Sequence, residues 1–268
     1  MTHATIVLLL TVGLFFGMLL FLEIGRRTRL RRIKEDSETS PEGIGSIDGA
    51  VFALLGLLIA FTFSGAAARF DNRRELIVEE TNDIGTAYLR VELLPAEAQP
   101  ALRKSFKEYL DARIEVYRKL PDIEAAKASL EKANDLQRQI WQQAVAASRA
   151  QGAPAAAPML LLPALNAMFD ITTTRTMATQ MHPPRIIFIM LFGLALAASL
   201  LAGHGMIGSR VRIWFHMLGF AMVMAVVVYV ILDIEYPRLG LIRVDAFDQA
   251  LVDLRESMNR DVKDSGPK

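Results

Sequence analysis

The chain has 268 residues, of which 52% are hydrophobic, and it carries a formal net charge of +1 and no cysteine. This near-neutral charge argues neither for nor against a nucleic-acid partner, and we expect none. The lack of cysteine excludes disulfides, thiolate metal sites and a cysteine nucleophile. The hydrophobic residues gather in four stretches long enough to cross a bilayer, at residues 5–24, 47–68, 186–206 and 214–232. We therefore expect an all-α integral membrane protein with four transmembrane helices.

The first span, at residues 5–24, is followed by a strongly basic segment. Residues 26–34 read RRTRLRRIK and hold six basic side chains. Basic clusters beside a span fix its orientation and attract anionic lipid. We expect residues 25–46 to be a basic loop. Because no basic segment precedes the span and no good cleavage site follows it, we interpret the span as a retained helix rather than a signal peptide.

The second span, at residues 47–69, carries two patterns. Small residues recur at every fourth position and form a ridge suited to close helix packing, namely Gly56, Ala60, Ser64 and Ala68. Leu57 and Phe61 lie on a neighbouring, bulky face. If this helix lined a pore, the two bulky side chains would form an apolar constriction of the kind that gates by dewetting. Packing and pore lining both stay open at this point.

The second span continues into a charged run without a proline until Pro95. Residues 47–94 therefore read as one helix of roughly 70 Å. Beyond the membrane, an apolar seam recurs every seven residues at Phe70, Ile77, Ile84 and Val91. Three basic residues lie within about two helical turns of the bilayer edge. In a symmetric oligomer with this helix at the axis they would form a positive ring that attracts anions, and they are Arg69, Arg73 and Arg74.

The remaining segments are expected to be helical as well. We expect residues 70–184 to form an extramembrane helical domain continuous with the second span, because amphipathic stripes and proline breaks predict further helices there. The third and fourth spans, at residues 185–206 and 212–235, are separated by a short turn and form an antiparallel hairpin. Residues 236–268 are expected to be a C-terminal tail that contains a short amphipathic helix.

The sequence contains no recognised catalytic motif. Metalloprotease, serine hydrolase, phosphate-loop and dinucleotide fingerprints are all missing from it. His204 and His216 flank the hairpin, and Asp233 and Glu235 stand at a membrane boundary. We interpret these four residues as interfacial polar groups rather than metal ligands. We therefore expect no catalytic residue, no metal and no cofactor, and we do not expect an enzyme.

Two motifs carry a resemblance to a known family. The stretch LLGLLIAFTFSGAAARFDNRRELIVEETNDIGTAYLRVELLP and the later DIEYPRLGLIRVD resemble the bestrophin-like domain family, over most of the chain. A weaker similarity to true bestrophins, which are pentameric anion-selective channels, rests on the apolar span that runs into Arg69 and Phe70. This similarity implies a homo-oligomer, by analogy a pentamer, that passes inorganic anions through a neck at Ala53, Leu57 and Phe61. The calcium clasp of animal bestrophins has no match, so calcium gating is not implied.

The leading hypothesis is a multi-pass channel of the cell (inner) membrane that conducts anions passively. The alternative is a non-conducting scaffold or sensor whose helical domain binds a partner. The expected partners are the lipid bilayer and further copies of the chain. Basic residues in the two short loops favour a helical domain outside the cell, whereas bestrophins place their helical extensions in the cytoplasm, so the orientation stays open.

Overall fold

The computed structural model describes residues 3–35, 44–206 and 210–264. Every element in these ranges is helical, which confirms the predicted all-α class. Residues 36–43 of the predicted basic loop and residues 207–209 of the predicted turn lie outside the described residues. The α-helices are α1 (His3–Glu35), α2 (Ile44–Leu89), α3 (Gln99–Arg118), α4 (Ile123–Ser148), α5 (Ala156–Gln180), α6 (Arg185–Gly205), α7 (Arg210–Glu235) and α8 (Gln249–Asp264), and the 3₁₀ helices are η1 (Arg90–Leu93) and η2 (Asp245–Asp248).

Four helical stretches are long and apolar enough to cross a membrane, as predicted, and they lie within His3–Arg31, Gly45–Leu93, Ala156–Gly205 and Trp214–Glu235. Helix α1 differs from the expected boundary, because it continues through the basic residues to Glu35 instead of giving way to a loop after Ile24. Arg26 and Arg27 both form ion pairs with Glu23, three and four residues earlier. Such pairs stabilise a helix, and they favour its extension into the basic segment.

The chain forms two compact units. The first unit contains Met1–Arg69 and His182–Ile242, and the second contains Phe70–Met181 and Arg243–Lys268. Helix α2 contributes residues 44–69 to the first unit and residues 70–89 to the second. The final helix, α8, belongs to the second unit, which the prediction of a C-terminal tail did not anticipate.

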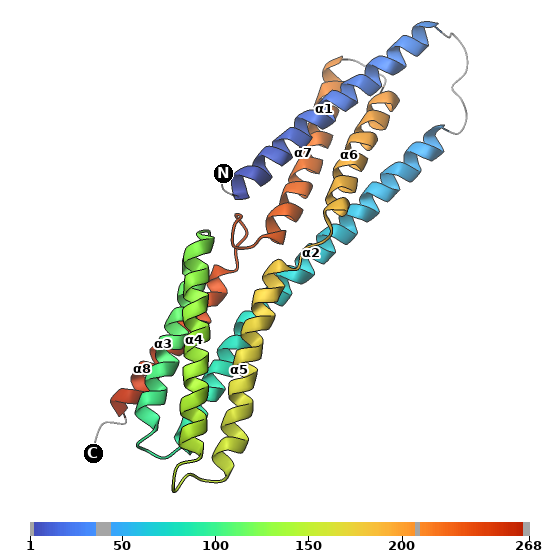
Figure 1. The fold of residues 1–268 in the computed structure, drawn as a ribbon. Coiled ribbons are helices and arrows are strands. Elements are labelled where there is room, and N and C mark those ends of the chain that lie inside the picture. The colour runs from blue at the N-terminus through green and yellow to red at the C-terminus, as the bar shows by residue number, and fades with distance from the viewer. Residues whose placement is uncertain (1–2, 36–43, 207–209, 265–268) are drawn as a thin grey trace. The chain divides into compact units, whose positions relative to one another are not determined.

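In the first unit, α1 lies beside both α6 and α7 (Figure 1). The backbones of α1 and α6 come closest at two glycines. A Cβ added to Gly25 would lie 2.1 Å from the carbonyl oxygen of Leu200, and one added to Gly203 would lie 2.0 Å from that of Leu22. Only glycine fits at either position, which is the small-residue packing typical of membrane helices. Fully buried side chains, among them Met18, Leu191 and Met217, fill the space between the three helices.

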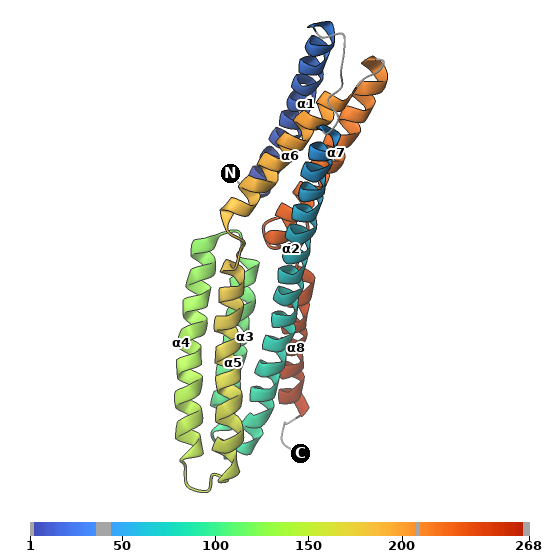
Figure 2. The same ribbon diagram turned by 90° about the vertical axis from the view of Figure 1, so that its right-hand side faces the viewer.

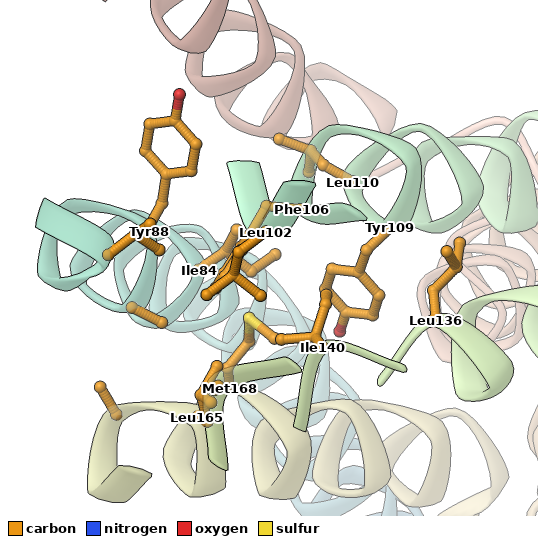
Figure 3. Packing of buried hydrophobic residues seen from close by; sticks show 14 of the residues in the cluster. Ile84, Tyr88, Leu102, Phe106, Tyr109, Leu110, Leu136, Ile140, Leu165 and Met168 are labelled. Carbon is orange, nitrogen blue, oxygen red and sulfur yellow. The ribbon is translucent and has the colours of Figure 1, made fainter. Parts of the chain in front are cut away.

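In the second unit, α3, α4 and α5 pack with the charged part of α2, and α8 lies along α3 (Figures 1 and 2). Three positions of the predicted seam, Ile77, Ile84 and Val91, are buried. Figure 3 shows how the core interdigitates between helices that are far apart in sequence, and its labelled members are Ile84, Tyr88, Leu102, Phe106, Tyr109, Leu110, Leu136, Ile140, Leu165 and Met168. Helix α8 adds Leu251 and Met258 to the same cluster.

A buried ionic cluster lies in the second unit beside this core. The carboxylate of Glu80, on α2, accepts a 2.5 Å hydrogen bond from Nε of Arg113, on α3. It also pairs with Arg175, on α5, whose Nη2 lies 3.5 Å from Asp248, on η2. The side chains of Glu80 and Arg113 are fully buried and that of Arg175 is nearly so. The cluster thus links α2, α3, α5 and η2. Removing one member would leave the others charged, buried and without a partner.

Replacing the central carboxylate should therefore destabilise the protein strongly. We expect Glu80→Gln to lower the free energy of unfolding by about 3–5 kcal/mol, because two arginines would stay buried without their anion. Chemical unfolding in mild detergent, followed by circular dichroism, measures this loss. The matched control is Glu124→Gln, which breaks only an exposed pair with Lys127 and should change little. Equal stability of the two variants would contradict the role of the cluster.

The same cluster predicts a pH dependence. Burial alone would raise the pKa of Glu80, but the charges and hydrogen bonds of Arg113 and Arg175 outweigh it and lower the pKa from 4.5 to about 2. Because the folded-state pKa is the lower one, the stabilisation is complete above pH 4.5 and is lost as the pH falls toward 2. The stability difference between the wild type and Glu80→Gln should narrow over that interval. The same unfolding assay, repeated between pH 4.5 and pH 2, measures this difference. A stability difference that does not change with pH would contradict the assigned pKa of Glu80.

Candidate functional site

The predicted neck residues lie on a face of α2 that the described residues leave uncovered. The side chain of Leu57 is 52% exposed and that of Phe61 is 68% exposed, and Ala53 is exposed as well. All four members of the predicted packing ridge, Gly56, Ala60, Ser64 and Ala68, are also exposed. The single chain thus leaves the predicted neck residues and the predicted packing ridge exposed, and neither group is buried in the core of the first unit.

The opposite side of this part of α2 faces the first unit. Leu55 and Ala66 are buried there, and Val51, Leu58 and Ile59 pack partly against the same cluster. At 3.6 residues per turn, Leu55 and Leu57 point about 160° apart. Leu57 therefore lies on the side away from the fold, whereas Phe61 stands at the edge between the two sides, where it is largely exposed and also borders a small pocket with α6 and α7.

Two of the three arginines of the predicted anion-attracting mouth are bound within the second unit. Arg73 is buried, and its guanidinium donates to the carbonyl oxygens of Ala178 at 3.1 Å and Met181 at 3.0 Å. These carbonyls lie at the end of α5, where a helix leaves acceptors without partners. Arg74 donates to Asp71 at 2.9 Å, and its guanidinium lies 4.2 Å from the centre of the Phe247 ring. Both arginines thus hold parts of their own unit together.

The third arginine forms a polar site in the first unit. Arg69, on α2, donates from Nε at 3.0 Å and from Nη2 at 2.6 Å to the two carboxylate oxygens of Glu235, on α7. The side chain of Glu235 is fully buried, and its Oε1 also lies 2.9 Å from Nδ1 of His182. The ring of His182 stacks on Tyr236 at 4.3 Å. A two-pronged arginine–carboxylate contact of this kind is both strong and geometrically specific.

The neighbouring carboxylate, Asp233, has a separate role. It accepts hydrogen bonds from the backbone N–H groups of Leu241 at 3.0 Å and Ile242 at 2.7 Å. The turn that follows α7 thereby folds back onto the end of its own helix. Gly240 lies directly against this carboxylate, because a Cβ added there would be 2.2 Å from Oδ1. Asp233 and Glu235 therefore bind different partners and do not form a shared cation site.

The two histidines that flank the predicted hairpin also have separate neighbours. The ring of His204 lies 3.5 Å from the hydroxyl of Thr28, and the ring of His216 contacts Phe215 edge-on. Within the part of the chain that the structure describes, no group of three or more His, Cys, Asp or Glu side chains is placed to hold a metal ion.

Sequence reasoning missed the pairing of Arg69 with Glu235, although a signal for it was present. Arg69 is the first charged residue after the second apolar run, and Glu235 follows Asp233 at the end of the fourth, so both were expected near a membrane boundary. Opposite charges at one boundary are candidates for pairing. The sequence does not say whether the ends of spans two and four lie at the same boundary close to each other, and that depends on how the helices pack.

The turn after α7 should not tolerate a larger residue than glycine. We expect Gly240→Ala to destabilise the protein by about 1–3 kcal/mol, because the new methyl group would displace the carboxylate of Asp233 from the backbone N–H groups that it accepts from. Unfolding in detergent measures the loss. Gly219→Ala is the matched control on α7, where a Cβ would meet nothing within 4 Å. A Gly240→Ala protein as stable as this control would refute the assigned role.

Comparison with known proteins identifies the family. The family model of the bestrophin-like domain matches residues 13–246, which include all four candidate spans in part or in full, together with Arg69, His182 and Glu235. No curated protein and no solved structure matches the chain significantly. The four apolar helices make it a multi-pass membrane protein in contact with lipid. The chain belongs to the bestrophin-like domain family.

Proposed function

We propose that this protein forms a homo-oligomer in the cell (inner) membrane and conducts ions passively along an axis lined by α2. The observation that carries the proposal is the exposed face of that helix. Leu57 and Phe61 are 52% and 68% exposed in the protomer, and the small residues beside them are exposed too. Small residues let neighbouring helices approach, and the bulky pair then forms an apolar constriction at the axis.

Inorganic anions are the proposed permeant ions, on the distant similarity to bestrophins. The sequence suggested that three arginines attract anions, but not all three are accessible in the structure. Arg73 and Arg74 are bound to partners within the second unit. Arg69 keeps part of its side chain exposed, at 29%, and it is the one of the three arginines that belongs to the first unit, together with Leu57 and Phe61. Chloride and potassium fluxes must accordingly be measured side by side.

The competing proposal is a non-conducting scaffold or sensor whose second unit binds a partner. A groove of about 550 Å³ between α4 and α5 favours this alternative. Two aromatic rings, Trp141 and Phe169, contact each other edge-on within it. Amide side chains and one arginine complete the lining, namely Asn134, Gln137, Gln142, Asn166 and Arg138. The mixture of aromatic and hydrogen-bonding groups is typical of binding surfaces.

Flux into liposomes separates the two proposals. Purified protein should pass chloride faster than empty liposomes do. Phe61→Ala should raise that flux by roughly tenfold, which corresponds to a barrier lowered by about 1.4 kcal/mol. The reason is that a smaller side chain widens the constriction and lets water enter it.

The control for this experiment is Phe63→Ala, the same change at an exposed phenylalanine two residues away on the other flank of the helix. It should leave the flux at the wild-type value. Circular dichroism checks that the wild type and both variants are folded. If all three are folded and oligomeric and none of them passes chloride, the scaffold proposal is favoured. A potassium flux larger than the chloride flux would overturn the assignment to anions.

A further inference from the structure

A small, mainly apolar cavity lies inside the first unit. Its volume is about 180 Å³, and it is bordered by α2, by α7 and by the start of α6 with Pro183 just before that helix, and it is partly open to the surroundings. Its lining is Leu58, Phe61, Thr62, Gly65, Arg69, Pro183, Ile187, Phe188, Ile231 and Glu235. The hydroxyl of Thr62 is already used, because it donates to the carbonyl oxygen of Leu58 at 2.8 Å. The cavity is therefore an apolar space with an arginine–carboxylate pair at one end.

The cavity extends along α2, a helix that is long and apolar enough to cross the bilayer. Its lining on α2 runs from Leu58 to Arg69, which spans about 16 Å of helix. Arg69 is the first charged residue after the apolar run, so it stands where the hydrocarbon meets the lipid headgroups. The cavity thus leads from headgroup level into the hydrocarbon, in the direction of an acyl chain.

The polar end presents a donor that the ion pair does not use. Arg69 binds Glu235 through Nε and Nη2, and within the described residues no hydrogen bond involves its Nη1. The absence of a side chain at Gly65 leaves space beside that nitrogen, because a Cβ there would be 3.3 Å from it. The carboxylate is fully buried whereas the arginine is 29% exposed. Of the two charged groups at this end, the guanidinium is therefore the more accessible to a ligand that enters the cavity.

We propose that this cavity binds one acyl chain of a phospholipid whose phosphate accepts a hydrogen bond from Nη1 of Arg69. Apolar cavities do not hold water, and the surrounding bilayer supplies acyl chains at this depth. The phosphate lies at the level of Arg69, and a guanidinium is well suited to bind phosphate oxygens. A volume below the roughly 300 Å³ of common ligand pockets accommodates part of one chain and not a whole soluble ligand.

Photo-crosslinking tests the proposal on the full chain. The protein is reconstituted into phosphatidylcholine vesicles with a small fraction of phosphatidylglycerol that carries a diazirine in its acyl chain. After illumination, peptide mapping should place the label on the lining residues, in peptides that contain Phe61 or Phe188. An excess of unlabelled phosphatidylglycerol should compete, and diacylglycerol, which has no phosphate, should not.

Two variants define the specificity of the label. Ile187→Trp fills the cavity and should lower labelling of these peptides by roughly tenfold. Ile189→Trp is the matched control, because Ile189 lies on the same helix, is 64% exposed and does not line the cavity. Arg69→Lys keeps the charge but loses the forked guanidinium, and it should weaken competition by phosphatidylglycerol while the protein stays folded.

Two results would overturn the proposal. Equal labelling in Ile187→Trp and Ile189→Trp would show that the probe reports only the lipid around the protein. Equal competition by diacylglycerol and phosphatidylglycerol would show that the cavity takes an acyl chain without recognising a phosphate. The experiment does not depend on ion conduction, so a protein that passes no ions can still confirm the lipid site.

Discussion

Helix α2 passes from an apolar run to a charged run without a break, and the ion pairs that it makes on either side of this change determine much of the structure. Arg69 binds Glu235 where the apolar run ends. Glu80 binds Arg113 and Arg175 three turns further along. A charge that leaves water needs a partner with good geometry. These two contacts therefore decide which helices must lie against α2 in each unit, whereas apolar packing alone would accept many arrangements.

The elements themselves could largely be predicted from the sequence. Hydrophobic runs gave the four spans, and the seven-residue seam placed Ile77, Ile84 and Val91 on a face that is buried. These signals are local, because they depend on the period of the helix and on the apolar character of each position. The extension of α1 was missed for an equally local reason, since the pairing of Glu23 with two arginines was not weighed against the loop signal.

The site was harder to predict, because it depends on contacts between distant segments. Arg69 was selected for its position at the membrane edge, but its partner Glu235 lies 166 residues away in sequence. Arg73 and Arg74 satisfied the same local criterion and are bound elsewhere. Proximity to the bilayer edge identifies arginines that could attract anions, but it does not show which of them already have partners. The face with Leu57 and Phe61 was easier to find, because helical spacing alone defines it.

The place of α8 in the second unit has a consequence for how the protein is made. The core of that unit needs Leu251 and Met258, which follow all four spans along the chain. The later part of α2 and helices α3, α4 and α5 leave the ribosome before α6 and α7 do, yet the core that they share stays incomplete until α8, which follows the last span, has been synthesised. During that interval its apolar surface is exposed and prone to aggregation. Membrane insertion of α6 and α7 must therefore precede completion of the core of the second unit. A delay in that insertion prolongs the exposure of the apolar surface of this core.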